Sequence, residues 1–175
     1  MIHSAMVPIR HKKTSKENAM FRIMLSGLIA SLFMAFVNVQ PVFAQGTAAE
    51  AKAMLEKAVA AVKAGKANAI DMFNKGEGGF KDRDLYVYCI NISDGKFVAH
   101  INPQLLGVDA RTLKDSSGNN FGQQIYDLAT KATDSTPVES TPYLFPRPGA
   151  DKTPVPKVSF VSKISDIYCG VGYYK

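Results

Sequence analysis

The residues best suited to chemistry in this sequence are polar side chains on predicted strands. His100 and Asn102 alternate on one face of a strand, and Tyr86 and Tyr88 alternate on the strand before it. Farther along, Lys157 places a cation in another apolar run. An ammonium and an imidazole can pair with a carboxylate, while tyrosine hydroxyls orient it and apolar walls hold the rest of a small organic anion. Other polar-tipped residues expected near the same cavity are Tyr126, Tyr143 and Ser159.

The predicted ligand-binding set is therefore Tyr86, Tyr88, His100, Asn102, Tyr143 and Lys157. A competing interpretation is an ordinary core, because a lone histidine on a half-apolar strand commonly bonds within the core. Tyrosine is also common in strands of every function. From these residues alone both interpretations stay open.

Signatures of an enzyme are missing from the sequence. It has no G-x-S-x-G, no H-E-x-x-H, and no P-loop, because the glycines at 76–79 are not followed by Gly-Lys-Ser/Thr. Asp82 and Asp84 fit solvated turn residues better than a catalytic pair. The cysteines form no C-x-x-C motif for zinc or haem. We expect a non-enzymatic protein without metal or cofactor.

Residues 1–44 have the pattern of a secretory signal peptide. Arg22 precedes an apolar stretch over 23–37, and residues 42–44 supply the small side chains that signal peptidase requires. A start at Met20 would give a leader of 25 residues, the usual length, so the true start stays open. An uncleaved membrane anchor is the alternative, although a spanning helix needs about 20 apolar residues. Cleavage would leave a single domain, residues 45–175, in the periplasm, with no membrane span.

The leader carries most of the excess positive charge. Five of the 21 Lys and Arg and one of the 15 acidic residues precede the cut, which leaves 16 basic and 14 acidic residues, a net charge of +2. Such a balance predicts no nucleic-acid partner. Cys89 and Cys169 both remain, and an exported chain with an even cysteine count usually pairs them. Two buried free thiols are the alternative.

Periodicity predicts the elements that must position these side chains. A capping box at Thr47 and Glu50 opens a long amphipathic helix that Gly65 weakens without necessarily ending. A shorter helix should begin near Asn120. Five strand segments are predicted: 84–93, 97–102, 138–145, 155–162 and 167–174.

The first two strands should form a hairpin through the Asp94-Gly95 pair, which suits a type I′ turn. Alternation separates Leu85, Val87 and Cys89 from Tyr86, Tyr88 and Ile90. In the second strand it separates Phe97, Ala99 and Ile101 from Val98, His100 and Asn102. Because both faces are largely apolar, we expect both strands to be covered on two sides.

Three motifs in fixed order resemble those of the single Cache domain, a PAS-like extracytoplasmic sensory module of bacteria. They are Gly78-Gly79-Phe80-x-x-x-Asp84-Leu85-Tyr86-Val87-Tyr88, then Asp94-Gly95-x-Phe97-x-Ala99-His100-x-Asn102-Pro103, then Pro156-Lys157-Val158-Ser159-Phe160-Val161-x-Lys163. No single motif is decisive, but their order and spacing are specific together. The resemblance covers nearly all of the mature chain. It implies an α+β fold, with a long N-terminal helix on a five-stranded antiparallel sheet and one short helix.

The resemblance also implies a function, a sensor that binds small molecules and often organic acids. By position, Tyr86, Tyr88, His100, Tyr143 and Lys157 fall where such pockets are lined. First and last strands are neighbours in a PAS-like sheet, which would bring Cys89 and Cys169 within bonding reach.

Receptor members continue into a membrane helix after the last strand, whereas this sequence ends at Lys175. We therefore expect a stand-alone periplasmic module that captures a small organic acid and signals through a membrane-bound sensor or receptor. The alternative is a structural or protein-interaction module with a vestigial pocket.

Overall fold

The computed structural model describes residues 45–149 and 151–175. The predicted signal peptide, residues 1–44, lies outside these residues and stays a prediction. The elements in chain order are α2 (Ala48–Lys75), β1 (Lys81–Asp82), β2 (Leu85–Asn91), β3 (Phe97–Ala99), the 3₁₀ turns η1 (Pro103–Leu105) and η2 (Ala110–Thr112), α3 (Phe121–Lys131), β4 (Val138–Glu139), β5 (Tyr143–Pro146), β6 (Pro154–Ile164) and β7 (Ile167–Tyr174).

Helix α2 begins at the predicted capping box. The Thr47 hydroxyl accepts a 3.2 Å bond from the Glu50 N–H, and the Glu50 carboxylate accepts a 2.8 Å bond from the Thr47 N–H. The helix kinks at Gly65, whose φ of 177° and ψ of 93° are not helical. It ends at Gly76, where a φ of 68° turns the chain in a left-handed cap.

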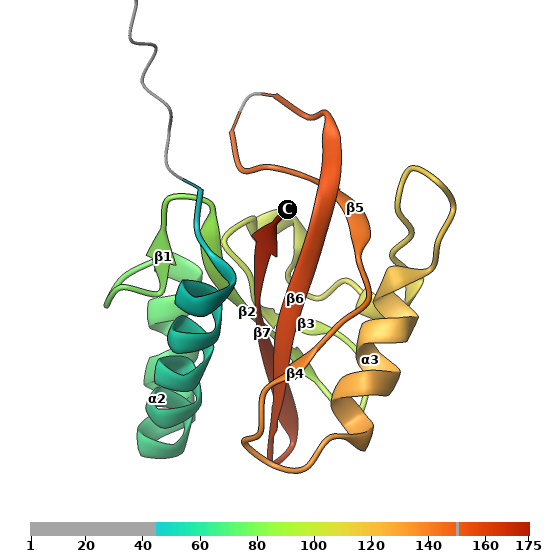
Figure 1. Cartoon of the computed structure of the whole chain (residues 1–175). Coiled ribbons are helices and arrows are strands. Elements are labelled where there is room, and N and C mark those ends of the chain that lie inside the picture. Colours follow the sequence, from blue (N-terminus) through green and yellow to red (C-terminus); the bar gives the residue numbers. More distant parts are fainter. Residues whose placement is uncertain (1–44, 150) are drawn as a thin grey trace, which may run out of the picture. The chain divides into compact units, whose positions relative to one another are not determined.

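All strands pair antiparallel in one sheet of order β1-β2-β7-β6-β4, in which β3 pairs with β2 and β5 pairs with β6. The middle strand is therefore β7. The predicted α+β fold is confirmed: α2 covers one face of the sheet and α3 the other (Figure 1). Three differences from the expected strands are the added β1, the division of the 138–145 segment into β4 and β5, and the end of the 97–102 strand at Ala99. His100 and Asn102 therefore lie beyond the strand on which they were expected, because the chain turns there into η1.

Each face of the sheet has its own apolar core. Leu55, Phe73, Val87 and Val171 belong to the core against α2. The core against α3 is more aromatic and contains Tyr88, Phe97, Phe121, Tyr143 and Tyr168. The predicted faces of the first strand are confirmed, since Leu85, Val87 and Cys89 lie in the α2 core while Tyr88 and Ile90 lie in the α3 core.

The predicted faces of the second strand are wrong. The register shifts between Cys89 and Ile90, so that Phe97 pairs with Ile90 while Ala99 pairs with Cys89. As a result, Phe97 belongs to the α3 core and Ala99 to the α2 core. The type I′ turn is also wrong, because Gly95 has a positive φ of 73° and Asp94 does not.

The disulfide is confirmed. Cys89 on β2 and Cys169 on β7 are directly opposite in the ladder, with Cα atoms 4.0 Å apart, and their sulfurs are bonded. The neighbouring first and last long strands are the arrangement that a PAS-like sheet implies.

Candidate functional site

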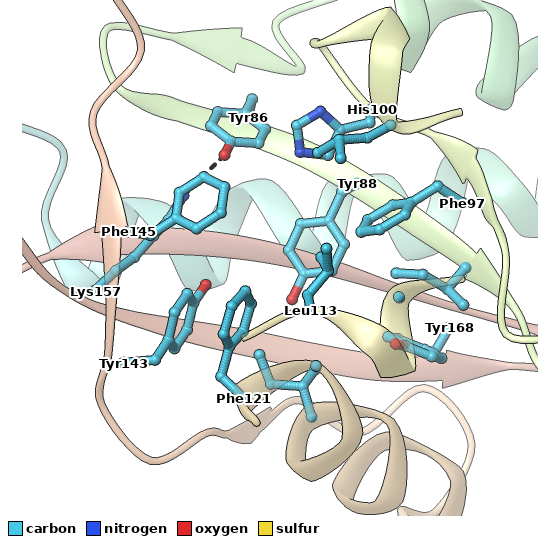
Figure 2. Close-up of a pocket in the computed structure, with 15 residues that line it drawn as sticks. Tyr86, Tyr88, Phe97, His100, Leu113, Phe121, Tyr143, Phe145, Lys157 and Tyr168 are labelled. Atoms are coloured by element: carbon cyan, nitrogen blue, oxygen red, sulfur yellow. Dashed lines mark hydrogen bonds between the residues drawn. The ribbon is translucent and has the colours of Figure 1, made fainter. Parts of the chain in front are cut away.

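A chamber of about 40 Å³ lies between the sheet and the layer formed by α3 and the two 3₁₀ turns. A water needs roughly 10–15 Å³ of such space, so there is room for about three waters or a molecule of a few heavy atoms. Figure 2 shows aromatic side chains converging on it from several elements. Its lining residues are Tyr86, Tyr88, Ile90, Phe97, His100, Leu105, Ala110, Leu113, Phe121, Gly122, Ile125, Tyr143, Phe145, Lys157 and Tyr168.

Lys157 is the cation of the chamber. It lies on β6 with only 2% of its side chain exposed, and its ammonium donates a 3.0 Å hydrogen bond to the hydroxyl of Tyr86 (Figure 2). The same nitrogen lies 4.4, 5.0 and 4.7 Å from the ring centres of Tyr86, Phe145 and Tyr174. Among the described residues it forms no ion pair.

This environment is unfavourable for the charged form. Burial lowers the pKa of Lys157 from 10.5 to about 7; the charge of Asp84 opposes this shift, and that of Arg147 adds to it. The aromatic faces attract the cation that remains. An anion entering the chamber would supply the counter-charge that the surrounding residues do not.

His100 follows β3 and is held on both sides by hydrogen bonds. Its backbone N–H donates to the Asn74 side chain at 2.9 Å, and its Nδ1 accepts from the Asn102 N–H at 2.9 Å. Burial, with the charge of Lys157, lowers the pKa of His100 to about 4, so the ring is neutral at pH 7. Since Nδ1 is the acceptor, Nε2 carries the proton and is the donor of this ring.

Two tyrosines complete the polar surface. The hydroxyls of Tyr143 and Ser159 are 2.8 Å apart, and the Tyr143 ring stacks on Phe121 with centres separated by 4.4 Å. Tyr88 lies across the middle of the group in Figure 2. Its buried hydroxyl makes no hydrogen bond of ordinary geometry among the described residues; the nearby Ser159 hydroxyl is paired with Tyr143. Burial raises the pKa of Tyr88 to about 12, although the Ser159 hydroxyl acts to lower it, so the Tyr88 hydroxyl keeps its proton and can donate it to a ligand.

An outer hollow of about 690 Å³ adjoins the chamber and shares four lining residues with it: Tyr86, His100, Leu105 and Phe145. Three cationic side chains line the hollow: Lys81, Arg147 and Lys152. No carboxylate is among its lining residues in the described part of the chain. The hollow therefore offers an anion a positively charged approach to the chamber.

Arg147 also ties this region to the start of the domain. Its guanidinium lies 4.5 Å from the ring centre of Tyr174 and bonds the Asp84 carboxylate at 2.9 Å. Asp84 in turn accepts a 2.7 Å bond from the backbone N–H of Gly46, just before α2. One chain of contacts thus leads from the aromatic box around Lys157, formed by the rings of Tyr86, Phe145 and Tyr174, to the N-terminus of the long helix.

Five of the six predicted ligand-binding residues line the chamber together. Asn102 does not; it lines the outer hollow, and its side chain caps η1 by accepting from the Gln104 N–H at 3.1 Å. Tyr126, expected near the cavity, bonds the Ile92 carbonyl at 2.6 Å instead. Two rings of the Lys157 box were missed: Phe145 and Tyr174. Neither local sequence, Leu144-Phe145-Pro146 or Tyr173-Tyr174, marks these rings as site residues, because only the strand order brings them to Lys157.

Within residues 45–149 and 151–175, no helix is long and apolar enough to cross a membrane. In the same ranges, no three His, Cys, Asp or Glu side chains gather as metal ligands would.

Comparison with known protein families finds a match over most of the chain. The family described as Single Cache domain 2 matches residues 22–174. No curated protein matches the sequence. A solved methyl-accepting chemotaxis protein from Vibrio parahaemolyticus RIMD 2210633 superposes with a TM-score of 0.56 at 19% identity, covering 90% of this chain and 96% of that one.

Two further solved structures are similar in fold. A periplasmic sensor domain of a chemotaxis protein gives a TM-score of 0.54 at 20% identity, with 91% of this chain and 99% of that one covered. A Cache chemosensory domain described as recognising carboxylic acids gives 0.52 at 19% identity, with 93% and 99% covered. At these identities the likeness concerns the fold.

Proposed function

The chain belongs to the Single Cache domain 2 family of sensory domains, and from this premise we propose that it binds a small organic acid in the chamber and reports its presence to a membrane-bound sensor or receptor. Family membership makes it a ligand-binding module and not an enzyme. The acid, its binding residues and the partner are the proposed parts.

The observation that carries the proposal is Lys157. A buried ammonium is costly unless it is paired, and this one has aromatic rings and a phenol as neighbours. A carboxylate in the chamber would offset the cost and gain a charge-assisted hydrogen bond. The Nε2–H of His100 and the buried hydroxyl of Tyr88 are candidate second and third donors.

The chamber volume limits the size of the ligand. Space of about 40 Å³ suits an acid of two or three carbons unless the walls move. One structural relative is described as recognising carboxylic acids, and we extend that chemistry to this chain. The cationic side chains of the outer hollow favour the arrival of an anion.

We place this activity in the periplasm. The predicted leader directs the chain out of the cytoplasm, and the Cys89–Cys169 bond is of a kind that persists in oxidising compartments. A structural relative described as periplasmic is consistent with this location.

A thermal-shift screen of the 45–175 domain against acetate, propionate, butyrate, pyruvate and succinate tests the proposal. An acid at 100 times its dissociation constant should stabilise the domain by about 2.7 kcal/mol. The corresponding amides, acetamide and propionamide, are the matched controls, because they keep the shape and lack the charge. A screen without any acid-specific shift would favour the alternative, an interaction module with a vestigial pocket.

A further inference from the structure

Two glycines lie on the chamber face of the middle strand. Gly170 and Gly172 are two residues apart on β7, so both face the same side of the sheet. Glycine weakens a strand interior and often marks a place where another group must approach closely. Neither Gly170 nor Gly172 is among the glycines with a positive φ, so the backbone conformation at these two positions does not require glycine.

The space around these two positions does require a residue without a side chain. A Cβ atom on Gly172 would overlap Cε of Lys157 and would lie 3.1 Å from its Nζ. A Cβ atom on Gly170 would overlap the ring of Tyr88 and would lie 2.5 Å from its hydroxyl oxygen. The two side chains thus occupy the volume that β7 leaves empty.

The sheet register explains the arrangement. Tyr88 on β2 is directly opposite Gly170, and β6, which carries Lys157, flanks β7 on the other side. The side chains of Tyr88 and Lys157, from the two strands that flank β7, therefore extend over the middle strand from opposite sides. In Figure 2 Tyr88 and Lys157 approach the same chamber from different strands.

We propose that Gly170 and Gly172 are positioning residues of the ligand site, each holding open the space through which one polar side chain reaches the chamber. Gly172 acts through Lys157, and Gly170 acts through Tyr88. The buried hydroxyl of Tyr88, which makes no hydrogen bond of ordinary geometry among the described residues, is thereby left as a donor for a ligand. The binding consequence rests on the proposed function, whereas the placement of the two side chains does not.

The decisive measurement is the pH titration of Lys157 in the Gly172→Ala variant. It is monitored by NMR on protein whose lysines are labelled with ¹³C at the ε-carbon. The Lys157 signal is assigned by its loss in Lys157→Met. Displacement from the aromatic box should move the Lys157 midpoint upward by at least one pH unit, toward the ordinary 10.5. The matched control is Gly65→Ala, because no atom lies within 4 Å of a Cβ at that position. A folded Gly172→Ala protein that titrates as the wild type overturns the proposal.

A pair of variants keeps the test valid should Gly172→Ala fail to fold. Adding Lys157→Ala removes the two Lys157 atoms that the new methyl group would meet and leaves the Ser159 Oγ, 3.0 Å from the Cβ position, so the double variant should regain stability relative to Gly172→Ala in urea unfolding. A double variant no more stable than Gly172→Ala would overturn the proposal, because the main clash would then lie elsewhere. The same logic pairs Gly170→Ala with Tyr88→Ala.

Acid binding gives a separate measurement. In calorimetric titrations with propionate, or with the best acid of the screen, Gly172→Ala should lose at least tenfold in affinity and Gly65→Ala should lose none. Unchanged affinity in a folded Gly172→Ala protein would overturn the positioning role. If no acid binds even the wild type, the proposed function fails, while the Lys157 titration still decides the role of Gly172.

Discussion

The ammonium of Lys157 is bonded to the phenol of Tyr86, at 3.0 Å, and to no carboxylate in the described part of the chain. A neutral hydrogen-bond partner cannot balance a buried charge, so a bound anion would lower the cost of keeping this ammonium buried.

Replacing Lys157 by methionine should keep most of the unbranched apolar side chain and remove its charge. We expect acid binding to weaken by about 1.5–3 kcal/mol, the range for hydrogen bonds to charged groups; Lys157→Ala should lose as much. Isothermal titration calorimetry measures it. Lys52→Met is the control, because this exposed lysine of α2 lines neither the chamber nor the outer hollow. Unchanged affinity in Lys157→Met would remove the residue from the site.

Acid binding should depend on pH. With its pKa lowered to about 7 by burial, Lys157 in the empty chamber is mostly neutral at pH 8. Pairing with a carboxylate favours the charged form, so binding above pH 7 must take up a proton. The apparent affinity should fall by up to about tenfold per pH unit from 7 to 9. Titrations at pH 8 in two buffers of different ionisation enthalpy count the protons; equal heats would contradict the prediction.

The same lysine should affect stability without ligand. Between about pH 7 and 10.5 the unfolded chain protonates Lys157 while the folded chain does not. The unfolded state then binds more protons, so the stability contribution rises with pH across this window and is constant below it. Urea unfolding at pH 7 and pH 9 should show the rise in wild type and its loss in Lys157→Met. If the free energy of unfolding changed equally with pH in the two proteins, Lys157 would titrate normally and the prediction would be wrong.

Removing the disulfide should be costly. For a loop of about 80 residues the chain-entropy model gives roughly 4.5 kcal/mol as an upper value, which is large beside a net stability of about 5–15 kcal/mol. The Cys89→Ser/Cys169→Ser protein should therefore lose up to this amount in urea unfolding. Thiol titration of unfolded, non-reduced wild type should find no free thiol. Two titratable thiols would contradict the bond.

The mature protein should begin at Gln45. Cleavage after Ala44 would remove the apolar stretch that the leader requires for export. Intact-mass measurement of protein from a periplasmic extract tests this. A mass that still includes residues 23–44 would indicate an anchored protein.

Local patterns predicted the elements that depend on local chemistry. The Thr47–Glu50 box and the alternation in β2 needed no distant partner, and both are confirmed. The faces of the second strand failed because the shift between Cys89 and Ile90 belongs to the pairing of two strands. A bulge of this kind leaves no mark in either strand alone.

The candidate site also combines residues that local patterns predicted with residues that only the strand order brings in. Alternation and the family resemblance placed Tyr86, Tyr88, His100, Tyr143 and Lys157 near one cavity. The box around Lys157 takes rings from β2, β5 and β7, which only the strand order brings together. The Cys169-Gly170-Val171-Gly172 pattern was the available signal for the middle strand, since alternate glycines leave one face of a strand bare.

The bond between Cys89 and Cys169 closes the intervening chain into a covalent ring. Thirteen of the fifteen residues that line the chamber lie inside this ring, and the other two, Tyr86 and Tyr88, immediately precede it. A protease that cuts once in an exposed loop, such as 114–119, would therefore leave every wall of the chamber on one connected molecule. A nicked domain of this design keeps its pieces joined, and reduction becomes the step that separates them.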